Sequence, residues 1–315
     1  MLSRVADSLY WLSRYLERAE HTARLLDVHL NLVLDESQSA PLRQRRQRLL
    51  QSVWVEPVGK VIDDDYALTQ FMTFDASNPG SITSAIALAR ENARQVREQI
   101  SSEMWTQINT VYLTIKSASM NAVWGNQPHE FFRAVRDGSH LFQGITDGTM
   151  NRNEGWMFIQ VGRYIERVGA IARLLDVNFD ALSESTHERD DYLQKLGLLK
   201  SVTSFEAYSK VYHGDLRPNW ILEFLLFNEQ FPHTVRFCVE QLTKALTAIS
   251  DETGVSKNSV LYRRAGRLQS ALSYDVVDDV LAGDLHRYLF EIQHWCEQIH
   301  TALYETYIAY TIETT

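Results

Sequence analysis

Two stretches of the chain carry nearly the same charged segment. Residues 14–28 are RYLERAEHTARLLDV and residues 163–177 are RYIERVGAIARLLDV, with ten of fifteen positions identical at a separation of 149 residues. Each contains the sequence Arg-Tyr-x-Glu-Arg, which places a carboxylate among guanidinium groups. The planar guanidinium of arginine can hold a carboxylate or phosphate with two parallel hydrogen bonds. The chemistry that this motif offers is therefore ion pairing, either within the protein or with an anionic ligand.

An apolar stripe at helical spacing predicts that each copy of the motif lies on a long helix. Leu9, Leu12 and Leu16 belong to the first stripe, and Val161, Ile165 and Val168 belong to the second. The charged residues lie off the stripe, with Glu17 and Arg24 nearly eclipsed and Arg14 and Arg18 as an i,i+4 pair beside them. In the second copy the same set is Arg163, Glu166, Arg167 and Arg173.

Three interpretations of the motif stay open. The charged faces could be exposed to solvent, where each ion pair is worth little. They could meet as reciprocal buried pairs, with Glu17 against Arg167 and Glu166 against Arg18, that fix how two halves dock. They could also line an arginine-rich groove for an anion such as a peptide carboxylate. The candidate residues for docking or binding are Arg14, Tyr15, Glu17, Arg18, Arg24, Arg90, Arg94, Arg163, Tyr164, Glu166, Arg167 and Arg173.

A second arginine cluster follows the turn sequence SNPGS, where Asn78 or Ser81 could cap a helix. Apolar spacing predicts that this helix runs from Ile82 to Ile100. Arg90, Arg94 and Arg97 share one flank of it. They favour either an ordinary exposed helix or a contribution to the groove.

Signals for catalysis and metal binding are weak. Neither cysteine has the context of a nucleophile, and no phosphate-binding or dinucleotide-binding loop is present in the sequence. The segment EIQHWCEQIH holds Glu291-x-x-His294 and Glu297-x-x-His300, which are similar to di-iron helix bundles. Both lie on one expected helix and fan across half its surface, so we expect no metal site and no cofactor.

The chain is predicted to be all-α and duplicated. FMTFDASNPGSI at 71–82 matches FLLFNEQFPHTV at 224–235 in the same order as the Glu-Arg segments. We therefore expect a helical bundle in which residues 1–150 and 151–315 are two copies of one unit, packed together with pseudo-twofold symmetry. The last stretch, 257–313, is expected to form one or two long helices broken near Gly283.

Composition narrows the environment and the partners. With 315 residues and a net charge of -9, a general nucleic-acid or anionic-membrane surface is not expected. The sequence has no long apolar run, and its two cysteines suggest no disulfide framework. We expect a cytoplasmic protein.

Several blocks together resemble the alpha-E family, named for an α-helical domain with a Glu-Arg motif. These are SRVADSLYWLSRYLERAEHTARLLD, NPGSI followed by ARENARQVRE and MW, FQGITDGTM before EGW, and GRYIER. The resemblance implies an all-α fold whose members are commonly encoded beside circularly permuted ATP-grasp ligases and transglutaminase-like peptidases. The family signature falls on Glu17 and Arg18 and again on Glu166 and Arg167.

The leading hypothesis is a non-catalytic partner or scaffold of an ATP-grasp-type ligase that holds a peptide or acidic acceptor. The alternatives are an enzyme that uses Glu17 or Glu166 as acid or base, or a di-metal bundle. Neighbouring arginines lower the pKa of a carboxylate, which suits holding an anion better than donating a proton.

Overall fold

A computed structural model describes residues 1–33, 39–125, 128–184 and 188–309. The chain is all-α, as predicted: it is 79% helical, with 15 α-helices and no strand in these ranges. The first seven helices are α1 (Ser3–Val33), α2 (Ser39–Ser52), α3 (Asp65–Thr73), α4 (Ile82–Gln95), α5 (Ser102–Ser117), α6 (Met120–Gly125) and α7 (Pro128–Thr149).

The rest of the chain begins with another long helix. These elements are α8 (Glu154–Glu184), α9 (Glu188–Ser201), α10 (Phe205–Tyr212), α11 (Pro218–Phe227), α12 (Val235–Thr253), α13 (Val260–Tyr274), α14 (Val277–Ala282), α15 (Leu285–Leu303) and a π-helical turn η1 (Tyr304–Ile308).

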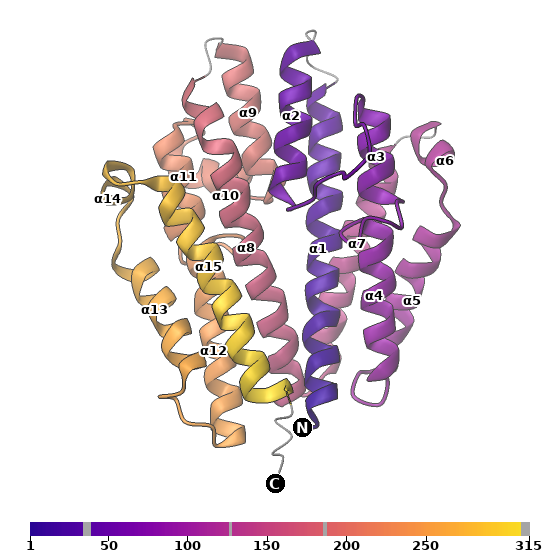
Figure 1. Cartoon of the computed structure of the whole chain (residues 1–315), viewed down its shortest axis with the longest axis vertical. Helices are drawn as coiled ribbons and strands as arrows, with labels where there is room; N and C mark the ends of the chain where they lie inside the picture. Colours follow the sequence, from indigo (N-terminus) through magenta and orange to yellow (C-terminus); the bar gives the residue numbers. More distant parts are fainter. Residues whose placement is uncertain (34–38, 126–127, 185–187, 310–315) are drawn as a thin grey trace.

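The long helices α1 and α8 lie at the centre and start at the same end of the molecule (Figure 1). The amino terminus at Met1 pairs with the Glu154 carboxylate at 2.7 Å, which ties the two starts together. Helices α4 and α7 cover α1, and α12 and α15 cover α8. Helix α5 then packs on α4 and α7, as α13 packs on α12 and α15. A duplicated unit would produce this pattern of contacts, and the two-copy division stays a prediction.

Caps explain where the two equivalent covering helices begin. Ser81 accepts a hydrogen bond from the backbone nitrogen of Ser84 at the start of α4, and Thr234 accepts one from Phe237 at the start of α12. Asn78, the other cap considered, instead holds the turn: its side chain bonds the Phe71 carbonyl and the Gly80 nitrogen.

Two helix boundaries differ from the prediction. Helix α4 ends at Gln95 and not at Ile100, yet Val96 and Ile100 are buried. The apolar stripe continues there because the turn after α4 also faces the core. In the C-terminal stretch the expected break at Gly283 is present, and a further break at Asp275 isolates the short α14. The end of that stretch, 310–313, lies outside the described residues.

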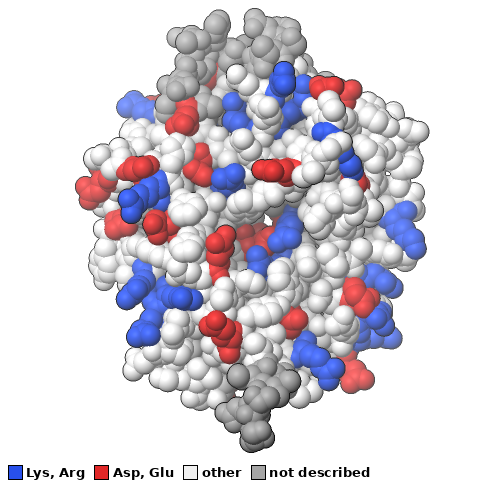
Figure 2. Space-filling view, viewed as in Figure 1, with Lys and Arg blue, Asp and Glu red and all other residues white. Residues whose placement is uncertain are grey.

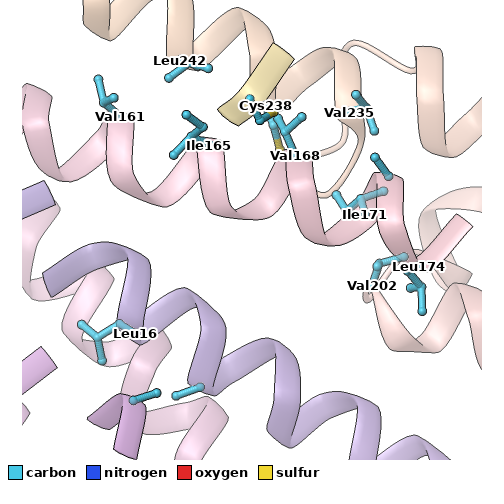
Figure 3. Close-up of a cluster of buried hydrophobic side chains, with 14 of the residues drawn as sticks. Leu16, Val161, Ile165, Val168, Ile171, Leu174, Val202, Val235, Cys238 and Leu242 are labelled. Atoms are coloured by element: carbon cyan, nitrogen blue, oxygen red, sulfur yellow. The ribbon is translucent and has the colours of Figure 1, made fainter. Parts of the chain in front are cut away.

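The core is formed by the apolar stripes of the central helices against their covering helices. Figure 3 shows Val161, Ile165 and Val168 of α8 facing Cys238 and Leu242 of α12. All five are buried. Each side chain of this size contributes about 1.5–3 kcal/mol when fully buried. The charged residues of the motif are left to meet across the interface between α1 and α8.

Candidate functional site

The two central helices approach very closely at one point. A Cβ at Gly162 would lie 2.3 Å from the carbonyl oxygen of Tyr10 and 2.2 Å from Oγ of Ser13, so the close approach requires glycine there. Ser13 and Gly162 precede the two copies of the motif by one residue each. The approach therefore sets the two Glu-Arg segments against each other.

The first carboxylate forms a sealed pair with the opposite helix. Arg167 donates to both oxygens of Glu17, from Nε at 2.5 Å and from Nη2 at 2.9 Å. The exposed fractions of the two side chains are only 8% and 3%. Gln143 donates to the same carboxylate at 3.3 Å, and Arg167 also donates to the Pro232 carbonyl at 3.0 Å.

The second carboxylate is shared by two arginines and is less enclosed. Glu166 accepts from Nε of Arg14 at 2.6 Å and from Nε of Arg18 at 2.7 Å. Arg18 is 31% exposed. Burial raises the pKa of Glu166, but the two guanidinium charges outweigh burial and lower the pKa to about 2.

These contacts exclude the interpretation in which the charged faces of the two helices are exposed to solvent. The reciprocal pairs Glu17 with Arg167 and Glu166 with Arg18 are present, and both carboxylates are buried. Glu17 and Arg24, which are nearly eclipsed on the helix, do not pair with each other: Arg24 bonds Glu20 one turn away, and Glu17 accepts from Arg167.

A cleft of about 530 Å³ opens beside the second pair. Arg14, Arg18 and Glu166 line it together with α15 and with the segments that follow α2 and precede α4. Figure 2 shows this face of the molecule hollowed near its centre, with acidic and basic side chains side by side at the opening. A volume of this size is typical of small-molecule and peptide sites.

A smaller inner pocket of about 40 Å³ lies behind the cleft and touches both copies of the motif. It shares Arg18, Trp54 and Glu166 with the cleft. Its wall includes Nε of Arg24 and Oγ1 of Thr22, two buried atoms that have no hydrogen-bond partner among the described residues. Because buried polar groups are normally paired, these atoms favour entry of a small polar group.

Two small residues line the cleft beside the open pair. Gly169 lies where the first copy has Glu20, and Gly80 lies where the second block has His233. Glu20 and His233 both line the inner pocket. The cleft is therefore bordered by glycines at positions whose matched residues are large.

Trp54 was missed by the sequence analysis although it lines both cavities. Its φ is +52°, a left-handed conformation that is rare for a bulky residue, and its side chain is 54% exposed. The signal was available: LLQSV at 49–53 matches LLKSV at 198–202 at the same separation of 149 residues. Trp54 follows the first of these blocks directly.

Several predicted site residues lie near the pairs but outside the cleft. Tyr15 stacks on Trp11, Tyr164 packs against Phe237, and Arg163 bonds the Gln160 side chain at 3.3 Å. Of the twelve candidates only Arg14, Arg18 and Glu166 line the cleft, while Glu17, Arg24 and Arg167 reach the inner pocket.

The remaining arginines are used elsewhere. Arg173 donates to the Gln51 carbonyl at 2.9 Å and pairs with Asp176. Arg90 bonds Asn109 at 2.6 Å, and Arg94 forms an exposed ion pair with Glu91. None of Arg90, Arg94 and Arg97 lines the cleft, so the cleft is not rich in arginine.

The histidines of the two Glu-x-x-His motifs on α15 have different hydrogen-bond partners. His300 Nδ1 lies 2.8 Å from the Tyr10 hydroxyl, whereas His294 Nε2 lies 2.6 Å from Gln298. Within the described ranges, no group of three or more histidine, cysteine, aspartate or glutamate residues is arranged to hold a metal ion. Burial lowers the pKa of His300 to about 4 and Arg14 adds to this shift, so its imidazole is neutral at pH 7.

The fold and the site together define the class of protein. It is an all-α bundle in which reciprocal Glu–Arg pairs join the two central helices. The chain belongs to the Alpha-E family, a predicted alpha-helical domain with a conserved ER motif, whose model matches residues 1–308. Within the matched range, the repeated segments carry the Glu-Arg pairs Glu17–Arg18 and Glu166–Arg167.

The similar proteins are themselves uncharacterized. Relatives in Mycobacterium bovis and Mycobacterium tuberculosis are each 25% identical over 277 residues, covering 81% of this chain and 30% of theirs. The chain thus spans about a third of the length of the relatives it matches. No solved structure matches it. None of the helices in the part of the chain that the structure describes has the length and hydropathy of a membrane span.

Proposed function

We propose that this domain is a non-catalytic binding module that holds a carboxylate-bearing peptide or acceptor for an ATP-grasp-type amide ligase. The observation that carries the proposal is the state of Arg18. Its Nε is fixed by Glu166, and no described residue accepts a hydrogen bond from its two terminal amino groups. These groups lie on a side chain that lines the cleft.

Glu166 preorganises the Arg18 guanidinium for ligand binding. Because Glu166 holds the guanidinium in place, a ligand that binds it loses less side-chain entropy than it would on a free arginine. The two terminal amino groups match the two oxygens of a carboxylate. Arg14 lies on the other oxygen of Glu166 and offsets its charge.

The same geometry argues against Glu166 as a general acid. A carboxyl group whose pKa is about 2 carries no proton to donate at neutral pH, and it is a weak base. We therefore favour holding over proton transfer at this site.

The partners in the proposal are a circularly permuted ATP-grasp protein and, with it, a transglutaminase-like peptidase. In the mycobacterial relatives the matching region is joined to a much longer remainder, which supports a domain that works beside others. In such a ligation, ATP activates the carboxylate of a second molecule as an acyl phosphate. The amine of the held acceptor then displaces phosphate and loses a proton, which leaves an amide, ADP and phosphate.

Calorimetric titration with tri-alanine tests the holding step. We expect tri-alanine amide to bind about tenfold or more weakly than tri-alanine, because the amide lacks the terminal carboxylate. Arg18→Gln should weaken tri-alanine binding by a similar factor. Arg4→Gln is the matched control, since Arg4 is exposed on the same helix and lies outside the cleft. Equal binding by the Arg18 variant and the wild type would contradict the proposal.

Size-exclusion chromatography with the purified ATP-grasp protein tests the partnership. We expect the two proteins to co-elute, and the Arg18→Gln variant to co-elute as well, since the cleft is assigned to the acceptor. Separate elution at concentrations of tens of micromolar would count against the ligase partner.

A further inference from the structure

The charges that line the cleft do not suit a simple anion. Arg14 and Arg18 are balanced against three carboxylates, Glu56, Glu166 and Glu297. Glu166 is paired with the two arginines, but Glu56, in the segment after α2, and Glu297, on α15, are exposed. Glu56 has no ion pair with a described residue, and the closest histidine nitrogen to Glu297 is 3.6 Å away. A purely anionic ligand in the cleft would therefore be repelled by Glu56 and Glu297.

Trp54 supplies an aromatic surface between these carboxylates and the inner pocket. The indole lines both cavities and is held by a left-handed backbone. Local strain of this kind is more common at functional sites. Thr203 has the same conformation, with φ of +54°, at the matched position of the other half. The turn therefore exists in both halves, and only the half beside the cleft carries an exposed ring.

The surroundings of Trp54 are shaped to admit the ring. A Cβ at Gly169 would lie 3.5 Å from the outer edge of the indole, an ordinary van der Waals contact, so the edge of the ring lies directly beside this glycine. In the sealed half the matched residues are Thr203 and Glu20, a small residue beside a large one. The large and small residues are exchanged between the two halves, which indicates that the exposed indole is a specific feature of the cleft.

We infer that the cleft binds a peptide through both of its charged ends, with the carboxylate at Arg18 and the ammonium group between Trp54, Glu56 and Glu297. The inference rests on the proposed function and names its ligand class. An ammonium group is attracted by the face of a tryptophan ring and by nearby carboxylates. The carboxylate end lies inward, because Arg18 and the unpaired Nε of buried Arg24 are on that side.

This orientation places the amine at the mouth of the cleft. Glu297 is 79% exposed, so an amine beside it remains accessible from solvent. A partner enzyme could then acylate the amine while the domain holds the carboxylate. The cleft volume of about 530 Å³ accommodates a short peptide.

Calorimetric titration with tri-alanine and N-acetyl-tri-alanine tests the inference. Acetylation removes the positive charge and keeps the carboxylate, so we expect binding to weaken about tenfold. Glu297→Gln and Trp54→Leu should each weaken tri-alanine about fivefold and leave the weaker binding of the acetylated peptide unchanged, with Trp54→Phe intermediate. Glu291→Gln, on the same helix and outside the cleft, is the matched control.

The outcomes separate the inference from the function on which it rests. If both peptides bind equally well and Arg18→Gln weakens both, the inference fails and the carboxylate site stands. If neither peptide binds at millimolar concentration, the inference and the proposed function fail together. Equal weakening of both peptides by Trp54→Leu would assign the indole to the peptide chain in place of the amine.

Discussion

The two copies of the Glu-Arg motif use the same residues in different ways. Glu17 and Arg167 form a bidentate pair that is almost completely buried and closed by Gln143 and the Pro232 carbonyl. Glu166 is held from one nitrogen each by Arg14 and Arg18, and the terminal groups of Arg18 face a cleft. The difference arises from neighbouring residues and not from the motif itself.

The comparison indicates how one motif could acquire two roles. Breaking a buried ion pair is costly, because it leaves an unpaired charge. We therefore expect the sealed pair to fix how α1 and α8 dock, and the proposed binding role falls to the open pair. Gly169 and Gly80 line the cleft beside the open pair.

The largest effect is expected where the two copies approach most closely. Gly162→Ala should lower the free energy of unfolding by roughly 3 kcal/mol or more, because the Tyr10 carbonyl must move to admit a methyl group. Ser13→Ala is its counterpart in the other copy and loses only a bond to that carbonyl, about 1 kcal/mol. Urea unfolding measures both, and equal losses would contradict the close approach.

The two carboxylates should differ in their effect on stability. Glu17→Gln leaves Arg167 buried without its carboxylate and should cost roughly 3 kcal/mol. Glu166→Gln leaves two arginines that can reach water and should cost about 1–2 kcal/mol. The variants are compared by denaturant unfolding at pH 7. A larger loss for Glu166→Gln would reverse the assignment of the two copies.

Acid should remove the contribution of the open pair. The pKa of Glu166 is about 2 in the folded protein, whereas an unfolded glutamate has a pKa of about 4.3. A lowered pKa means that the stabilisation is complete above about pH 5 and is lost as the pH falls toward 2. The stability difference between the wild type and Glu166→Gln, followed over this range, should shrink with falling pH. A constant difference would show that the charge of Glu166 is not what matters.

The smallest effect on stability is expected from closing the cleft. Gly169→Glu places a carboxylate four residues before Arg173, as Glu20 stands before Arg24, and should change the unfolding free energy by less than about 1 kcal/mol. Tri-alanine binding should weaken about tenfold, because the new side chain displaces Trp54 and repels a carboxylate. Gly266→Glu on α13, where space is open, is the matched control. Unchanged binding in Gly169→Glu would place the ligand elsewhere.

The sequence offered the reciprocal pairs as one of three interpretations and did not locate the cleft. Repetition of Glu17–Arg18 as Glu166–Arg167 favoured a partner for each charge, but it did not decide between a buried pair, a groove and a solvated face. Whether a pair is open depends on the volume of residues from distant segments, such as Gly80. That volume has no periodic signal in the sequence.

Intrahelical spacing was also an incomplete guide to partners. Arg24 can reach Glu17 or Glu20 from its helix, and the partner was decided by Arg167 of another helix. Arg90 and Arg94 have the composition of a binding surface, but Arg90 bonds Asn109 of α5, Arg94 pairs with Glu91 of its own helix, and neither lines the cleft.

Matched arginine variants test the central claim most directly. Arg18→Gln and Arg167→Gln remove the same residue from the two copies, and denaturant unfolding at pH 7 gives the stability of each. We expect Arg167→Gln to lose roughly 3 kcal/mol, because buried Glu17 keeps no cation, and Arg18→Gln to lose less than about 1 kcal/mol, because Arg14 still holds Glu166. Equal losses, or a larger loss for Arg18→Gln, would contradict the division of the motif into a structural copy and a binding copy.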